Sequence, residues 1–281
     1  MFYTFAFLFI FALAAYVLSI RYIEQHPGES GMLTFPKFGI EGESSWKGAA
    51  TFGILLLIVL IVGVVIMTVL TKIVSLFNAF FALMMISMSL LFVSDYSNSM
   101  AKLVRHRTFG LIIQIGLALF LGLGWLIAPS WPTYDVAAFI AIYVILRNIG
   151  PVRLRYLLLG FAGIMIYDVW GVLGSGLISG IVMGKTLPPL LILVPDNLFS
   201  VKSQVSYLLG AGDLLVGGIA VMTARKYHIE KYVFLGFAVG LFLAPVVTMF
   251  IRVVPATVPI AIPVLIAFLI AMRIKKISPE W

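Results

Sequence analysis

The sequence predicts an all-α integral membrane protein whose chain crosses the bilayer nine times. Of its 281 residues, 62% are hydrophobic and only 11% are charged, a balance far outside the range of soluble domains. Apolar runs of roughly 18 residues or more recur from one end of the chain to the other, and each can cross about 30 Å of hydrocarbon as a helix. Because unpaired backbone groups cost several kcal/mol each in lipid, such spans must be helical.

The expected spans are bounded by the charged residues, prolines and turn residues that interrupt the apolar runs. The first run lacks the basic start and the small-residue cleavage site of a secretory signal, so we expect it to be retained as a helix. Residues 1–281 are expected to form one membrane domain, with five scaffold helices in residues 1–155 and four further helices in residues 156–281. The nine expected spans cover residues 2–20, 49–70, 73–93, 109–128, 134–147, 156–178, 206–224, 232–254 and 255–272.

The basic residues are distributed unevenly between the two ends of these spans. Only four of the 19 lysines and arginines, namely Lys72, Lys185, Lys202 and Arg252, follow even-numbered spans. Because cytoplasmic loops carry an excess of Lys and Arg, we expect a multi-pass cell-membrane protein with its N-terminus outside and its C-terminus in the cytoplasm. Their position at span ends also accounts for the net charge of +8 without a nucleic-acid partner.

The connection over residues 180–205 is unusual for a loop. Its central stretch reads "KTLPPLLILVPDNLFSVK", which is too apolar for a free linker and too often interrupted by proline to span the membrane. We expect this connection to lie against the membrane or to cover another part of the protein.

Missing residue types exclude several kinds of site. The chain has no cysteine, so it holds no disulfide and no thiolate metal site. His26, His106 and His228 all fall in predicted loops, which argues against a serine–histidine dyad or an H-E-x-x-H zinc site within the membrane. We therefore expect no metal site of these kinds.

Two aspartates lie deep inside predicted spans, whereas the other acidic residues lie in loops or near span ends. Asp135, at the start of the fifth span, is expected to be hydrated or to cap that helix. At about 1.5 Å per residue, Asp168 lies roughly 18–20 Å from the cytoplasmic side and Asp213 roughly 10–12 Å from the outer side. In a core about 30 Å thick these depths coincide, so antiparallel helices can bring the two carboxylates together.

A carboxylate at this depth usually faces the bundle interior and marks a functional path. No span offers a lysine or arginine at the same depth, so the two neighbouring carboxylates are expected to share one proton. Such a pair supplies a general acid and a general base together, which predicts hydrolysis of peptide bonds inside the membrane. Gly210 and Gly212, directly before Asp213, leave room for another backbone to approach.

Three short motifs resemble those of a known family. "YD" at Tyr167 and Asp168, and "GAGD" ending at Asp213, resemble the YD and GxGD motifs of the presenilin and signal-peptide-peptidase intramembrane aspartyl proteases. At the counterpart of the family's Pro-Ala-Leu motif, Pro255 and Ala256 match and Thr257 stands in place of leucine. With these motifs and no visible additional domain, the chain most resembles a minimal archaeal presenilin homologue.

The resemblance implies a presenilin-like fold and an aspartic endopeptidase that cleaves transmembrane segments of other membrane proteins. An aspartyl mechanism itself needs neither a metal nor an organic cofactor. The 180–205 connection would be the loop that admits or contacts substrate, and its expected outer position favours substrates whose N-termini lie in the cytoplasm. Residues 156–281 would hold the catalytic helices. The implied site has Asp168 and Asp213 as catalytic residues, and Tyr167, Gly210, Gly212, Pro255, Ala256 and Thr257 as residues that bind substrate or shape the site.

Two other functional classes stay open. An ion transporter or a cation leak channel also uses paired intramembrane carboxylates, although it favours inverted repeats, and the first five spans hold no counterpart of "YD" or "GAGD". An assembly scaffold would use the small-residue faces for helix packing alone. The expected partners are the lipid bilayer and transmembrane substrates, and assembly into homo-oligomers is left open.

Overall fold

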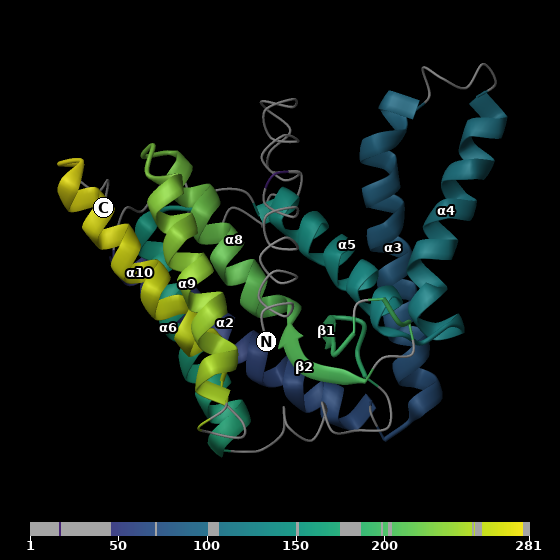
Figure 1. The fold of residues 1–281 in the computed structure, drawn as a ribbon, viewed down its shortest axis with the longest axis horizontal. Coiled ribbons are helices and arrows are strands. Elements are labelled where there is room, and N and C mark those ends of the chain that lie inside the picture. The colour runs from purple at the N-terminus through teal and green to yellow at the C-terminus, as the bar shows by residue number, and fades with distance from the viewer. Residues whose placement is uncertain are drawn as a thin grey trace.

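The structure, a computed structural model, describes residues 17, 46–70, 72–100, 107–149, 152–174, 187–197, 199–201, 204–248, 250 and 255–277. Helices make up most of this part of the chain (Figure 1). The first four described helices are α2 (Trp46–Leu70), α3 (Val74–Met100), α4 (Arg107–Ile127) and α5 (Trp131–Ile149). The later ones are α6 (Leu154–Val169), which continues into the π-helical turn η1 (Trp170–Gly174), α8 (Ala211–Arg225), α9 (Glu230–Thr248) and α10 (Thr257–Ile274).

Five helical segments of the described chain are long and apolar enough to cross a membrane. Large apolar side chains are exposed along several helices, for example Val59 on α2, Leu83 on α3 and Phe120 on α4, as expected for surfaces that face lipid. The coarser prediction, a mainly helical chain with several potential membrane spans, is confirmed. The count of nine stays a prediction, and the first predicted span lies outside the described residues apart from Val17. The five segments are Val74–Ser94, Trp131–Ile149, Leu154–Gly174, Glu230–Val247 and Thr257–Ile274.

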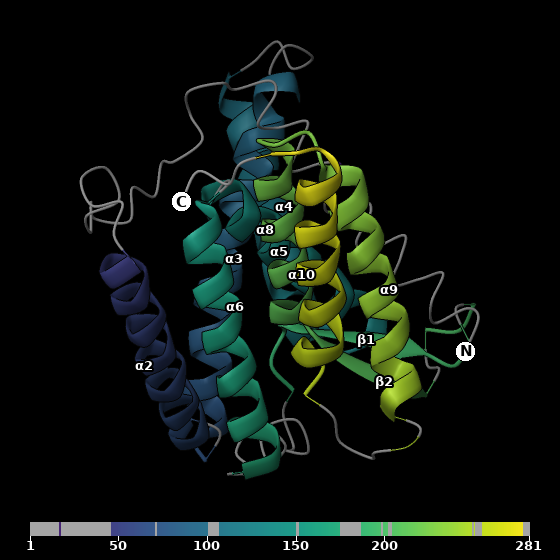
Figure 2. The same ribbon diagram turned by 90° about the vertical axis from the view of Figure 1, so that its left-hand side faces the viewer.

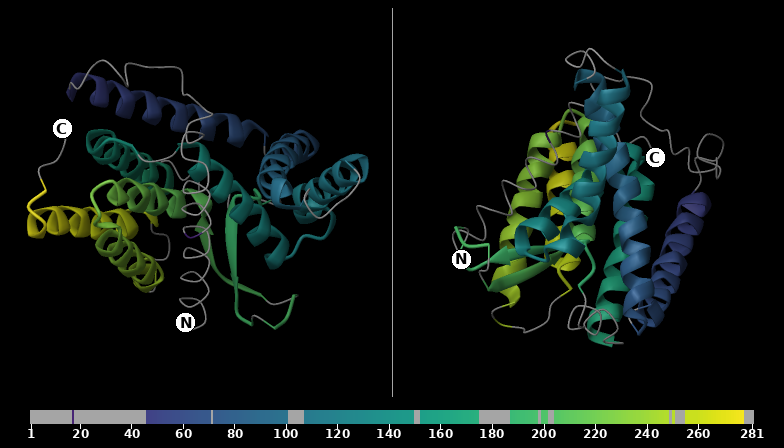
Figure 3. Two further views of the ribbon diagram at one scale, coloured as in Figure 1. Left: turned by 90° about the horizontal axis from the view of Figure 1, so that it is seen from above. Right: turned by 90° about the vertical axis from the view of Figure 1, so that its right-hand side faces the viewer.

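Helix α5 joins two groups of helices. Figure 1 shows α3 and α4 on one side of the molecule and α6, α8, α9 and α10 on the other, and the view from above in Figure 3 shows α5 between them. Ala138 and Ile142 on α5 belong to the larger buried cluster, which includes residues of α6, α8, α9 and α10. Ala137 and Ile140 belong to a second cluster with α3 and α4. Opposite faces of one helix therefore pack against both groups.

The seventh predicted span is wrong at its beginning. Residues 206–210, predicted as helix, belong to strand β2 (Val205–Gly210), which pairs in antiparallel fashion with β1 (Leu191–Pro195). All five residues of β1 are buried, so this part of the apolar 180–205 connection packs against the protein. A short apolar run does not distinguish a strand from a helix by periodicity. The described fold is thus not purely helical, and α8 begins only at Ala211.

Candidate active site

Asp168 lies one residue before the end of α6, where the helix changes its winding. The backbone N–H of Trp170 lies within reach of the carbonyls of both Ile166 and Tyr167, and the chain continues as the π-helical turn η1. Turns of this kind are rare and occur frequently at functional sites. The Asp168 side chain is half-buried. Asp168 therefore lies at an irregular helix end rather than in the middle of a regular helix.

Asp213 lies in the first turn of α8, immediately after strand β2. Its Oδ2 accepts a hydrogen bond of 3.2 Å from the backbone N–H of Gly210, the residue that caps the helix. The first N–H groups of a helix have no partner within the helix, and a carboxylate at this position satisfies one of them. Glycine leaves room here, because a Cβ atom at residue 210 would lie only 3.1 Å from Asp213 Oδ2.

Thr257 connects the two aspartates. Its backbone N–H donates to Asp168 Oδ2 at 3.1 Å, and its hydroxyl Oγ1 donates to Asp213 Oδ1 at 2.7 Å. The residue is buried, with 4% of its surface exposed. One residue therefore holds a carboxyl group from α6 and a carboxyl group from α8 next to each other.

The position of Thr257 follows from the start of α10. Proline fixes its own backbone and lacks an N–H, and Pro255 stands just before the helix, so that Thr257 is its first residue. An N–H in the first helical turn is free to donate, and the helix dipole favours a negative group there. Helix α10 packs against α6, α8 and α9, as Figure 2 shows. This packing directs the start of α10 at both carboxyl groups.

Glycine in α9 permits the close approach of α10. A Cβ atom at Gly240 would lie 2.6 Å from the Cα of Ile260, and one at Gly236 would lie 2.6 Å from the carbonyl oxygen of Pro263. Contacts this short do not occur, so larger residues at these two positions would force α10 away from α9. Small residues therefore help to set where Thr257 lies.

The remaining predicted site residues surround this group without bonding to the carboxyl groups. Tyr167 is half-buried on α6, and within the described part of the chain no hydrogen bond joins it to either aspartate. Pro255 is buried and Ala256 half-buried at the start of α10. Gly212 is exposed, and a Cβ added there would meet no described atom within 4 Å. The two motif glycines thus differ: Gly210 makes room for the Asp213 carboxylate, and Gly212 borders open space.

The two aspartates at the centre of the site form a pair of carboxyl groups. Asp168 and Asp213 are close enough to interact electrostatically, and among the described residues neither is paired with a lysine or arginine. Two carboxylates this close resist simultaneous ionisation, so the pair is suited to hold one proton between them. No cluster of three or more metal-ligating side chains occurs in the described residues. Two neighbouring carboxyl groups can act as a proton donor and a proton acceptor.

Asp135 differs from its predicted state. It was expected to be hydrated or to cap its own helix, but it is buried, with 4% exposure. Its Oδ1 accepts a hydrogen bond of 2.7 Å from the backbone N–H of Leu193 in β1. The prediction failed because the partner is distant in the sequence, and local spacing carries no signal for a strand that packs across the start of α5.

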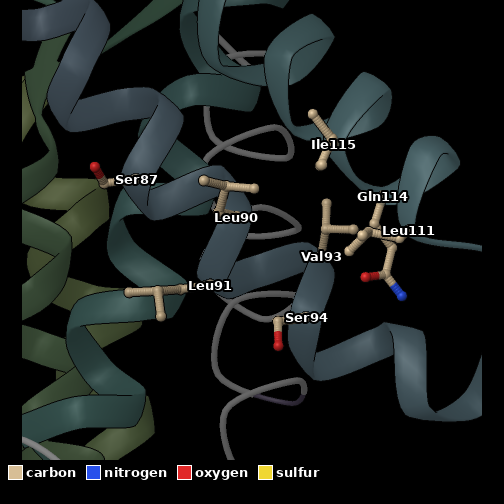
Figure 4. A pocket seen from close by; sticks show the side chains of 8 residues that line it. All are labelled: Ser87, Leu90, Leu91, Val93, Ser94, Leu111, Gln114 and Ile115. Atoms are coloured by element: carbon tan, nitrogen blue, oxygen red, sulfur yellow. The ribbon is translucent and has the colours of Figure 1, made fainter. Parts of the chain in front are cut away.

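A separate cavity of about 530 Å³ lies between α3 and α4. Figure 4 shows apolar side chains such as Leu90 and Ile115 around it, together with Ser87, Ser94 and Gln114. None of its lining residues belongs to α6, α8 or α10. The cavity is therefore not part of the aspartate site.

Comparison of the chain with protein-family models and with curated proteins finds no match. The resemblance to the presenilin and signal-peptide-peptidase family rests on the motif residues themselves.

Proposed function

We propose that this protein is an intramembrane aspartyl protease that hydrolyses peptide bonds within the transmembrane segments of other proteins. The observation that carries the proposal is the double hydrogen bond of Thr257, which holds Asp168 and Asp213 at one point between three helices. A general acid and a general base must reach the same peptide bond. Two carboxyl groups bonded to one residue meet this requirement.

The proposed reaction uses one ionised and one protonated carboxyl group. The carboxylate takes a proton from water while the water oxygen attacks the carbonyl carbon, and the carboxylic acid gives its proton to the carbonyl oxygen. Collapse of the tetrahedral intermediate breaks the C–N bond, and a carboxyl group delivers a proton to the leaving nitrogen. The products are a new carboxyl terminus and a new amino terminus, and no cofactor is consumed.

Strand β2 gives the substrate a place to bind in extended form. Leu209 pairs with Ile192, and the next residue, Gly210, directs its N–H to Asp213. Because successive strand residues direct their N–H groups to opposite sides, the N–H groups of Leu208 and Gly210 point away from β1. The aspartate site therefore lies on the outward side of β2, where the described chain has no third strand. An unwound substrate segment would pair with this edge.

The proposed orientation has the N-terminus outside and the C-terminus in the cytoplasm, as the distribution of basic residues indicates. It places the hairpin of β1 and β2 at the outer side of the membrane. We expect a preference for substrates whose N-termini lie in the cytoplasm. A cytoplasm-only reporter fused to the C-terminus tests this orientation, and a silent reporter on a well-expressed fusion would reverse it.

The function is tested with purified protein in liposomes and a single-helix membrane substrate. Wild-type protein should release peptides, and Asp168→Ala and Asp213→Ala should each abolish their release. Cleavage that survives either change would refute the proposed dyad. Ion flux measured in the same liposomes tests the transporter alternative: flux through wild-type protein that both substitutions abolish, with no peptide release, would favour a channel or transporter.

A further inference from the structure

The first turn of α5 holds the β1–β2 hairpin at three points. The Trp131 indole N–H donates to the carbonyl of Ser200 at 2.9 Å, close to the turn that joins the strands. The Tyr134 hydroxyl donates to the carbonyl of Leu187 at 3.3 Å, ahead of β1. Asp135 accepts the N–H of Leu193 in the middle of β1 at 2.7 Å. The hairpin is thus attached to α5 at its beginning, centre and tip.

The bond to Asp135 occupies the outer edge of β1. In the hairpin register Ile192 is paired with Leu209, and the carbonyl of Leu190 accepts the N–H of Ala211 at 2.8 Å. The backbone N–H and C=O groups of the even-numbered residues of β1 therefore point toward β2, and the N–H of Leu193 points away from it. Asp135 satisfies this outward N–H and thereby closes the edge. Only the β2 edge, which leads to Asp213, stays available to a further strand in the described part of the chain.

Asp135 destabilises the fold at this buried position. Its Oδ2 is buried and has no hydrogen-bond partner among the described residues, and a buried polar atom without a partner destabilises a fold. Leu191 and Leu193 of β1 lie in one buried apolar cluster with Ala137 and Ile140 of α5. A leucine would fill the same space without the unsatisfied oxygen. What leucine lacks is an acceptor for the Leu193 N–H.

We propose that Asp135 is a positioning residue that fixes the hairpin against α5 and so sets which peptide bond of the substrate reaches Asp168 and Asp213. The inference rests on the proposed proteolytic function. β2 runs directly into the turn that carries Asp213, so a shift of the hairpin along α5 moves the substrate-binding edge relative to the dyad. Loss of the anchor then changes the cleavage position as well as the rate.

Two substitutions at Asp135 separate the anchor from general packing. Asp135→Asn keeps an oxygen that accepts the Leu193 N–H, whereas Asp135→Leu keeps the approximate volume and removes the acceptor. We expect Asp135→Leu to lower kcat/KM about tenfold, in line with the loss of one buried hydrogen bond, and to add new cleavage positions in the product mass spectrum. Asp135→Asn should keep the wild-type cleavage positions.

Hydrogen exchange of the β1 backbone gives a readout that does not depend on activity. We expect exchange at Leu193 to be at least about tenfold faster in Asp135→Leu than in wild-type protein, and unchanged in Asp135→Asn. If wild-type protein shows no cleavage, the exchange data still decide the anchor while the proteolytic function fails. Wild-type exchange together with wild-type cleavage positions in Asp135→Leu would overturn the inference.

If Asp135→Leu does not fold, Trp131→Phe removes the indole donor to Ser200 and tests the same attachment at the hairpin tip. Faster exchange in the hairpin together with additional cleavage positions supports the anchor. A folded Trp131→Phe variant with wild-type exchange and wild-type products would overturn it.

Discussion

The α3–α4 pair and the group formed by α6, α8 and α10 use polar side chains in opposite ways. On the α3–α4 side, the Ser87 hydroxyl donates to the carbonyl of Leu83 and the Trp125 indole to the carbonyl of Gly122. Both bonds stay within one turn of one helix. On the other side, Thr257 bonds to aspartates that are 89 and 44 residues away in the sequence. The bonds of Ser87 and Trp125 stay within one helix, whereas the bonds of Thr257 join separate helices.

The glycines of the two regions differ in how closely another helix approaches them. A Cβ at Gly122 on α4 would lie 2.8 Å from the Cα of Ile86 on α3, whereas one at Gly212 would meet no described atom within 4 Å. Gly122 allows two helices to touch, which is common in membranes. Gly212 borders the aspartates without packing against another helix. The comparison separates a region in which glycine allows helices to pack from a region in which two carboxyl groups lie beside one threonine.

The largest expected effect comes from the aspartates. Asp168→Asn, Asp213→Asn and the double variant should each lower kcat about a thousandfold or more, to the same background, because the two groups act as one unit. Peptide release in liposomes measures this, with thermal unfolding as a control for folding. Losses that multiply in the double variant would show that the carboxyl groups act independently.

The next largest effect is expected at Thr257. Thr257→Val keeps the shape and the backbone N–H to Asp168 but removes the hydroxyl that donates to Asp213, so kcat should fall about tenfold to a hundredfold. Thr257→Ser keeps both donors and should stay within about threefold of wild type, with KM unchanged in both variants. Equal activity of the serine and valine variants would mean that the hydroxyl plays no part in the site.

A smaller effect distinguishes the two motif glycines. Gly210→Ala should lower kcat about tenfold, because the new methyl group would crowd Asp213 Oδ2 at 3.1 Å. Gly212→Ala should leave kcat nearly unchanged and raise KM, since it narrows only the open space beside the dyad. It should also stabilise the fold by up to about 1 kcal/mol, because alanine favours a helix over glycine. Steady-state kinetics of both variants measures these effects. Equal changes of KM and of kcat in Gly210→Ala and Gly212→Ala would contradict the distinction.

The smallest effect on cleavage is expected in the α3–α4 pair. Gly122→Ala should destabilise the protein by about 1–3 kcal/mol through overpacking, while cleavage per folded molecule stays within about twofold. Gly116→Ala on the same helix meets no described atom within 4 Å and serves as the matched control, with stability unchanged or raised. Thermal unfolding measures the difference. A large loss of cleavage in folded Gly122→Ala would mean that this pair is coupled to the site.

The sequence was sufficient to predict a mainly helical membrane protein and to select Asp168 and Asp213 as a pair. Hydropathy and depth carry this information because a carboxylate is costly in lipid wherever it lies along a span. The pairing was predicted from a helix over residues 206–224, yet its first five residues form part of a strand. Both side chains still bond to one residue, because the start of α10 brings Thr257 to each of them.

What the sequence did not predict depends on contacts between distant segments. Thr257 was recognised as a departure from leucine in the family motif, but its bridging role was missed. A usable signal was present, since a threonine just after Pro255 offers a hydroxyl together with an unpaired N–H in the first turn of a helix. Asp135 gave no such signal, because its partner Leu193 is 58 residues away. Long-range pairing of this kind is invisible to local periodicity.

The most direct test of the proteolytic account is cleavage of a membrane-embedded substrate in oxygen-18-labelled water, followed by mass spectrometry of the products. The account predicts a new carboxyl terminus within the apolar segment of the substrate that carries one heavy oxygen atom, because water attacks the carbonyl carbon directly. The Asp213→Asn variant should yield no such product. Absence of a new terminus inside the apolar segment, or equal product from wild-type protein and Asp213→Asn, would contradict it.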